Sequence, residues 1–76
     1  MMIFDQKAFG ERIQQLRVSR GMTQETLAEK ANTERSHIAK IENGKRSCSI
    51  DLLIVFASVF DVSTDYLLFG RSENEA

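Results

Sequence analysis

The sequence has no proline and only one cysteine, Cys48, among its 76 residues. A single cysteine cannot close an internal disulfide, and the pattern lacks the ligand spacing of a zinc finger, so neither kind of small scaffold applies. No apolar run reaches the length of a membrane span, and the N-terminus lacks a basic segment followed by an apolar one. We therefore expect one small domain in a reducing cytoplasm, with no membrane partner and with Cys48 buried or half-buried.

The sequence also has little of what catalysis requires. The only histidine, His37, has no neighbouring nucleophile or ligand cluster, and the carboxylates are scattered along the chain. There is no glycine-rich loop of the kind that holds phosphate groups. We expect the chain not to be an enzyme, and we expect neither a metal ion nor a cofactor.

Charge is unevenly distributed along the chain, although the formal net charge is only −1. Residues 1–46 carry nine Lys or Arg against six Asp or Glu, a balance of +3. Residues 47–76 carry one basic residue, Arg71, against five acids, a balance of −4. This polarity would orient the first half toward phosphate groups, but a chance distribution of so few charges would look the same.

Apolar residues recur at helical spacing throughout, which predicts an all-α fold of five helices. The expected ranges are 6–20, 24–31, 34–42, 49–60 and 64–69. Side chains suited to cap helix N-termini mark the starts of the first, second, third and fifth helices; they are Asp5, Thr23, Thr33 and Ser63. Residues 7–70 form the expected domain, and residues 71–76 form a polar C-terminal tail.

Residues 24–43, QETLAEKANTERSHIAKIEN, have the pattern of a helix-turn-helix. Two short helices that cross steeply need a small residue such as Ala28 at the crossing, and Asn32 tolerates the left-handed backbone of the turn. Apolar residues would hold the pair together; they are Leu27, Ala31, Ile38 and Ile41. A helix held in this way presents its outer face to the major groove of DNA.

Several segments extend this likeness along the chain: FGERIQQLR, RGMTQETLAEK, IENGKR, SIDLL and VSTDYLLFG. From Phe9 to Gly70, about four-fifths of the chain, the sequence resembles the phage repressor/Cro-like (XRE-type) helix-turn-helix family. It departs from the family at Asn32, which replaces the usual turn glycine, and at Cys48, where proline is common. The resemblance implies a five-helix, repressor-like domain whose third helix enters the major groove. We expect a transcription regulator, a repressor, that binds double-stranded DNA at a pseudo-palindromic operator as a homodimer.

The third helix has an outward set of residues that would face base edges. Arg35, Ser36 and Lys40 hold the base-contact positions that the resemblance implies, and arginine is suited to a bidentate contact with guanine. Glu34 and His37 complete the expected set. Glu34 would accept from cytosine, stabilise the helix N-terminus or repel phosphate. The alternative for the whole set is an ordinary solvated face.

A second set would contact the DNA backbone. Thr23 and Gln24 lie at the start of the second helix, where backbone N–H groups can bind a phosphate. Asn43, Lys45 and Arg46 follow the third helix and resemble the second backbone clamp of the family. Their alternative interpretation is a plain helix end followed by a basic loop.

The resemblance also implies one structural ion pair. In similar proteins an arginine at the position of Arg17 and a glutamate at the position of Glu42 fix the third helix against the first. Arginine suits this role because its planar guanidinium can meet a carboxylate with two hydrogen bonds.

The fourth helix is apolar over more of its circumference than one core requires. One stripe would face the core: Ile50, Leu53, Phe56, Ala57 and Phe60. A second stripe, together with the end of the fifth helix, would form a dimer interface: Leu52, Val55, Val59, Leu68 and Phe69. Asp51, Ser58 and Ile54 are left for solvent. Two alternatives stay open: the first and fifth helices cover everything, or this surface binds another protein in an antitoxin-like module with weak or no specific DNA binding.

Overall fold

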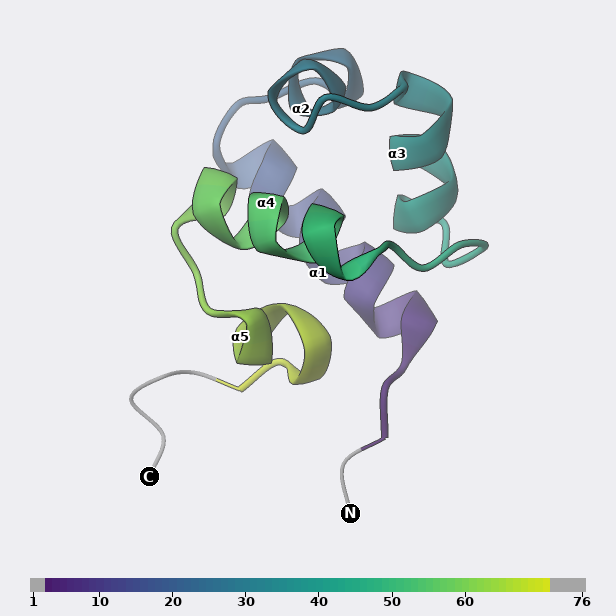
Figure 1. Ribbon diagram of the computed structural model, residues 1–76, viewed down its shortest axis with the longest axis vertical. Coiled ribbons are helices and arrows are strands. Elements are labelled where there is room, and N and C mark those ends of the chain that lie inside the picture. The colour runs from purple at the N-terminus through teal and green to yellow at the C-terminus, as the bar shows by residue number, and fades with distance from the viewer. Residues whose placement is uncertain (1–2, 72–76) are drawn as a thin grey trace.

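The computed structural model describes residues 3–71, and in this range it contains five helices and no strand (Figure 1). The helices are α1 (Gln6–Ser19), α2 (Gln24–Lys30), α3 (Arg35–Glu42), α4 (Ile50–Phe60) and α5 (Thr64–Phe69). The all-α class and the five helices predicted from the sequence are thereby confirmed, with ends that differ by about one residue. Residues 72–76 of the expected polar tail lie outside the described residues.

Four of the five helices begin at a side chain that accepts a backbone hydrogen bond. Each of the four accepts from the N–H three residues further along the chain, at 3.0–3.1 Å; they are Asp5, Thr23, Ser49 and Ser63. The expectation that Thr33 caps α3 is wrong, because Glu34 occupies that position without a side-chain cap. The Thr33 N–H instead donates to the Ala28 carbonyl at 2.9 Å, so Thr33 belongs to the turn that ends α2.

The core lies where α1 meets the other helices. Helix α3 packs against α1 and α2, while α4 and α5 pack against α1 and against each other (Figure 1). Burying a large apolar side chain contributes about 1.5–3 kcal/mol, and eight of them are fully buried. They are Phe9, Ile13, Leu27, Ile38, Ile41, Phe56, Phe60 and Leu67. Ala31 is buried as well, so the apolar positions expected in the helix-turn-helix are confirmed.

Helices α1 and α3 approach closely at Gly10, a feature that the sequence pattern did not reveal. A Cβ atom added to Gly10 would lie 2.1 Å from the Ile41 carbonyl oxygen and 2.9 Å from that of Glu42. Both atoms belong to the backbone of α3, so they cannot move aside independently. Glycine at this position therefore sets the distance between α1 and the C-terminal turn of α3.

The expected division of α4 into two stripes needs a correction. Ile50, expected in the core, is 75% exposed, whereas Leu52, expected at the dimer interface, is only 9% exposed and belongs to the core. Leu52, Phe56 and Phe60 lie four residues apart and define the buried side of α4. Residues two apart on a helix differ by roughly 200°, so Ile50 points away from that side.

Candidate nucleic-acid interface

The turn between α2 and α3 has the backbone geometry that the sequence predicts. Asn32 has a φ of 53°, in the left-handed region, and its N–H donates to the Glu29 carbonyl at 3.2 Å. Ala28 is buried where the two helices cross. Asparagine therefore performs the task for which glycine is the commoner choice, and the departure from the family pattern leaves the turn intact.

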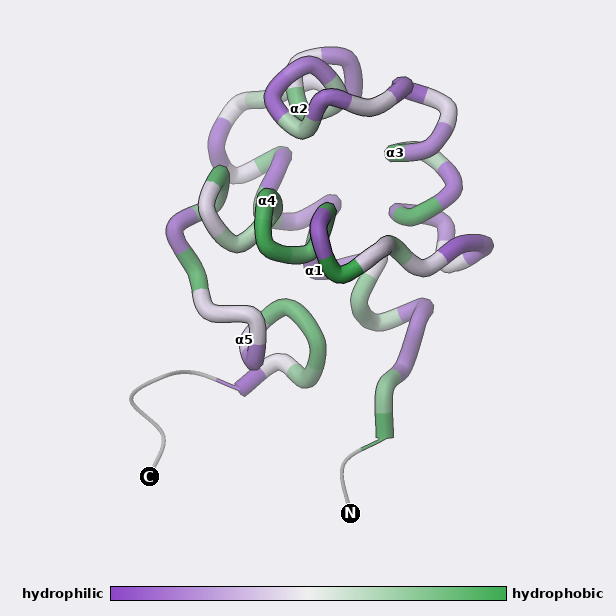
Figure 2. The backbone as a smooth tube through the Cα atoms, viewed as in Figure 1, coloured by the Kyte–Doolittle hydropathy of each residue, from purple (hydrophilic) through white to green (hydrophobic). Residues whose placement is uncertain are grey.

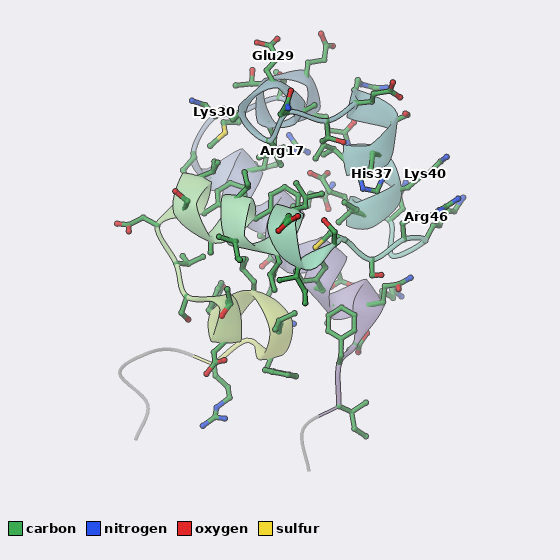
Figure 3. The ribbon with its side chains drawn as sticks, in the orientation of Figure 1. Arg17, Glu29, Lys30, His37, Lys40 and Arg46 are labelled. Atoms are coloured by element: carbon green, nitrogen blue, oxygen red, sulfur yellow. The ribbon has the colours of Figure 1, made fainter. Side chains whose placement is uncertain are left out.

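The outward side of α3 carries polar and charged groups. Glu34, Arg35, Ser36 and Lys40 are exposed, while Ile38 and Ile41 on the opposite side are buried. Figure 3 shows Lys40 extending away from the body of the molecule, on the same side as Arg46. The exposed groups can therefore reach a ligand without any rearrangement of the core.

His37 occupies a different part of α3. It is half-buried and lines a hollow whose other wall includes Ser49 and Asp51 at the start of α4. The turn residues Asn32 and Thr33 also line this hollow. His37 thus lies on the flank of α3 that faces α4, at the edge of the outward surface.

The segment after α3 has a well-defined backbone that holds its two basic side chains. The N–H of Gly44 donates to the Ile41 carbonyl at 3.0 Å, and that of Lys45 donates to the Lys40 carbonyl at 2.9 Å. This pair of bonds, with Gly44 at a φ of 75°, is a Schellman motif. The Gln6 side chain also donates to the Gly44 carbonyl at 2.8 Å, which ties the segment to α1. Lys45 and its neighbour Arg46 are exposed directly beyond this anchored turn.

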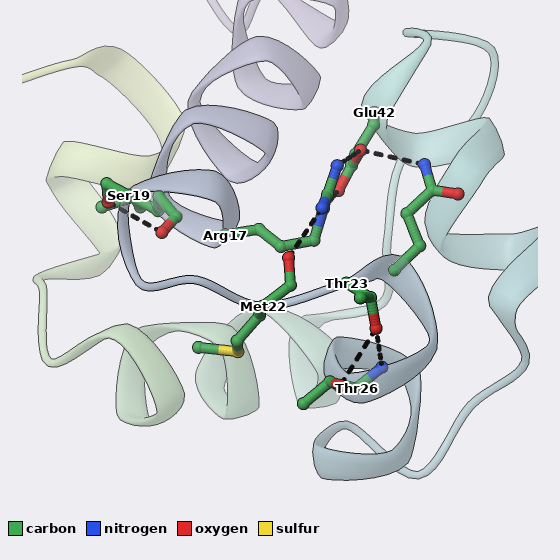
Figure 4. Close-up of polar contacts among 8 residues, drawn as sticks. Arg17, Ser19, Met22, Thr23, Thr26 and Glu42 are labelled. Atoms are coloured by element: carbon green, nitrogen blue, oxygen red, sulfur yellow. Dashed lines mark hydrogen bonds and ion pairs between the residues drawn. The ribbon is translucent and has the colours of Figure 1, made fainter.

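A buried carboxylate joins α3 to α1 (Figure 4). Arg17 donates from Nε to Glu42 Oε2 at 2.6 Å and from Nη2 to Glu42 Oε1 at 3.1 Å. Arg17 Nη1 also donates to the Met22 carbonyl at 2.8 Å, in the segment before α2. The Glu42 side chain is only 1% exposed, and removal of either partner would leave a charge uncompensated in the interior. The ion pair therefore fixes the outward face of α3 relative to the rest of the domain.

Three arginines in the basic half of the sequence donate hydrogen bonds within the fold, so the excess positive charge of that half is not all available to a ligand. Besides Arg17, Arg12 donates to the carbonyls of Leu67 and Leu68, both at 2.9 Å. Arg20 donates to the Phe60 carbonyl at 2.7 Å. The charge count along the sequence could not separate these arginines from the exposed basic residues of α3 and the segment after it. That distinction requires the contacts of each side chain.

Three other features bear on the class of site. No group of three or more His, Cys, Asp or Glu residues in the range 3–71 is arranged to hold a metal ion. Cys48 is half-buried as expected, and burial raises the pKa of its thiol. Among the described helices, none has both the length and the hydropathy needed to cross a membrane.

Comparisons with known proteins point to one family. The helix-turn-helix family matches residues 13–67. The transcriptional activator BcrR of Enterococcus faecalis is 40% identical over 63 residues, which cover 83% of this chain and 31% of BcrR. The chain spans less than two thirds of the length of the curated relatives it matches.

Solved structures show the same arrangement of helices. The restriction-modification controller protein C.AhdI of Aeromonas hydrophila aligns with a TM-score of 0.78 and 33% identity, over 84% of this chain and 97% of that protein. The P22 c2 repressor, solved in complex with a synthetic operator, aligns with a TM-score of 0.80 and 25% identity, over 83% of this chain and 96% of that one.

Proposed function

The chain belongs to the phage repressor/Cro-like (XRE-type) helix-turn-helix family of DNA-binding regulators, and on this premise we propose that it is a repressor that binds a pseudo-palindromic operator as a dimer. One observation carries the proposal. Exposed Arg35 and Lys40 on α3, with Lys45 and Arg46 just beyond it, form a basic surface on helices that a buried ion pair holds in place. Where an operator overlaps a promoter, a bound dimer would block transcription with no surface other than its DNA and dimer contacts.

Contacts to bases and to phosphates are assigned to separate parts of this surface. Arg35, Ser36 and Lys40 face base edges, with Glu34 and His37 at the border of the contact. Phosphates bind at two clamps, one at the start of α2, where Thr23 lies and where the sequence also suggests Gln24, and one after α3, formed by Asn43, Lys45 and Arg46. The exposure of the α3 residues and the anchored backbone after α3 support this assignment.

The dimer surface is revised from the one that the sequence suggests. Leu52 is in the core, whereas the other residues expected there are half-buried: Val55, Val59, Leu68 and Phe69. Large exposed apolar side chains lie instead at Ile50 and Ile54. Ile50 also lines a hollow, together with Phe4, Leu53 and Leu68. We place the centre of the dimer interface at Ile50 and Ile54, because a second copy that covers this exposed apolar surface removes it from water and so stabilises the dimer.

Selection from a random duplex library near physiological salt tests the proposal. Enrichment of a pseudo-palindrome with half-sites about one helical turn apart is the expected result. Weak binding without enrichment, lost as salt rises, would contradict operator recognition. That result would favour the second candidate, a partner-binding module, for which the exposed apolar surface at Ile50 and Ile54 is the supporting observation.

A further inference from the structure

Gln24, the first residue of α2, has an inward hydrogen bond that its expected role does not require. Its side chain is half-buried, and Nε2 donates to Glu42 Oε1 at 3.1 Å. A carboxylate offers only acceptor atoms, so the amide nitrogen of Gln24 must be the atom that faces it. The side chain expected to bind a phosphate is therefore bonded to the last residue of α3.

We propose that Gln24 is a positioning residue, which fixes α2 relative to α3 and contributes to operator binding through Glu42. This inference rests on the proposed operator-binding function. Arg17 already anchors Glu42 to α1, so the bond from Gln24 connects α2 to the same buried carboxylate. Hydrogen bonds to charged groups are stronger than those between neutral groups, and stronger still away from water.

The positioning role and a direct phosphate contact have different consequences. A phosphate contact carries no sequence information, so its loss weakens binding to every duplex. A change in the angle between α2 and α3 instead moves Arg35 relative to the base edges, and small displacements weaken base-specific hydrogen bonds. Loss of a positioning residue should therefore reduce operator binding and leave binding to an unrelated duplex nearly unchanged.

A double-mutant cycle separates the two roles. Gln24→Met is made in the natural sequence and in a background with Arg17→Met and Glu42→Met, since replacing both partners of a buried ion pair by apolar residues often preserves the fold. We expect Gln24→Met to weaken binding to the selected operator about tenfold in the natural sequence. In the background without the ion pair the effect should fall below about twofold. An equal loss in both backgrounds, or on a scrambled duplex, would show a direct phosphate contact and overturn the proposal.

Two further variants serve as controls. Gln14→Met makes the same substitution at an exposed position of α1 and should leave affinity unchanged. Gln24→Asn keeps an amide at the start of α2 but is one methylene too short for the same bond, and it should reproduce the effect of Gln24→Met. If Gln24→Met lowers the folded fraction in circular dichroism, Gln24→Asn replaces it in the double-mutant cycle, with the same expected outcomes.

Urea unfolding of the cycle's four proteins tests the bond without DNA. Gln24→Met should lower the unfolding midpoint of the natural sequence and leave that of the background nearly unchanged. Equal effects in both backgrounds would overturn the positioning role. A natural sequence that binds operator and scrambled duplex equally would instead overturn the proposed function, so the two failures are distinguishable.

Discussion

Helices α3 and α4 present exposed faces of different chemistry. The outward side of α3 is charged and polar, whereas the outward side of α4 carries the large apolar Ile50 and Ile54 beside the polar Asp51 and Ser58. Along its length α4 is the more hydrophobic of the two helices (Figure 2). A charged face is well solvated in water and attracts ligands of opposite charge. Covering an apolar face removes it from water, which lowers the free energy. The contrast supports the proposals made above, in which DNA binds the α3 face and a second copy of the chain covers the α4 face.

Gly10→Ala tests the packing on which the α3 face depends and should have the largest effect. Alanine normally stabilises a helix interior by about 1 kcal/mol relative to glycine. Here the added Cβ would lie 2.1 Å from the Ile41 carbonyl oxygen, so we expect a loss of at least about 3 kcal/mol in urea unfolding. Gly21→Ala is the matched control, because a Cβ there meets nothing within 4 Å. Gly21 has a left-handed backbone, so alanine there should lower stability only by the strain of that conformation, about 1–2 kcal/mol. A stabilised Gly10→Ala variant would contradict the close approach of α1 and α3.

The difference between the two faces also explains what the sequence could and could not predict. On α3 the buried residues other than Glu42 are apolar and the exposed ones are polar, so the 3.6-residue period separates Ile38 and Ile41 from Arg35 and Lys40. On α4 nearly every residue is apolar, and periodicity alone cannot tell which side faces the core. For that reason the pattern predicts Ile50 in the core and Leu52 at the surface, whereas the structure has Leu52 in the core and Ile50 exposed.

Contacts between distant segments are the other features that local sequence patterns cannot predict. The sequence gives no period or motif for the close approach at Gly10, because the neighbouring atoms are backbone carbonyls of α3. The inward bond of Gln24 depends on the side-chain geometry of a residue 18 positions away. The partnership of Arg17 and Glu42 was accessible only through the family resemblance, because no local pattern links two residues 25 positions apart.

Ile54→Lys tests the assignment of the α4 face. Ile54 is 56% exposed, so a lysine there should leave the stability of the single domain nearly unchanged while introducing an unpaired charge at the dimer centre. We expect dimerisation to weaken by about 3 kcal/mol in sedimentation equilibrium. Val18→Lys, at a 60% exposed position on α1, is the matched control and should dimerise like the natural sequence. Equal dimerisation of all three proteins would place the interface elsewhere.

Arg35→Ala tests base recognition on the α3 face. The side chain is exposed at the first position of α3, so its removal should not affect folding. We expect the variant to lose about 2 kcal/mol of discrimination at one base pair of each half-site, measured with single-substitution operators. An equal loss on operator and scrambled duplexes would make Arg35 a phosphate contact.

Lys45→Ala should have the smallest effect and a different signature. Lys45 lies beyond the Schellman turn at Gly44, and a phosphate contact there would release counterions on any duplex. We expect affinity to fall by about 1 kcal/mol on operator and scrambled DNA alike, and the magnitude of the negative slope of log K against log salt to decrease by about one. Lys30→Ala is the matched control, because Figure 3 shows Lys30 on the side of the molecule opposite to Lys40 and Arg46. If both variants changed the slope equally, the dependence on salt would report the overall charge of the domain rather than a clamp after α3.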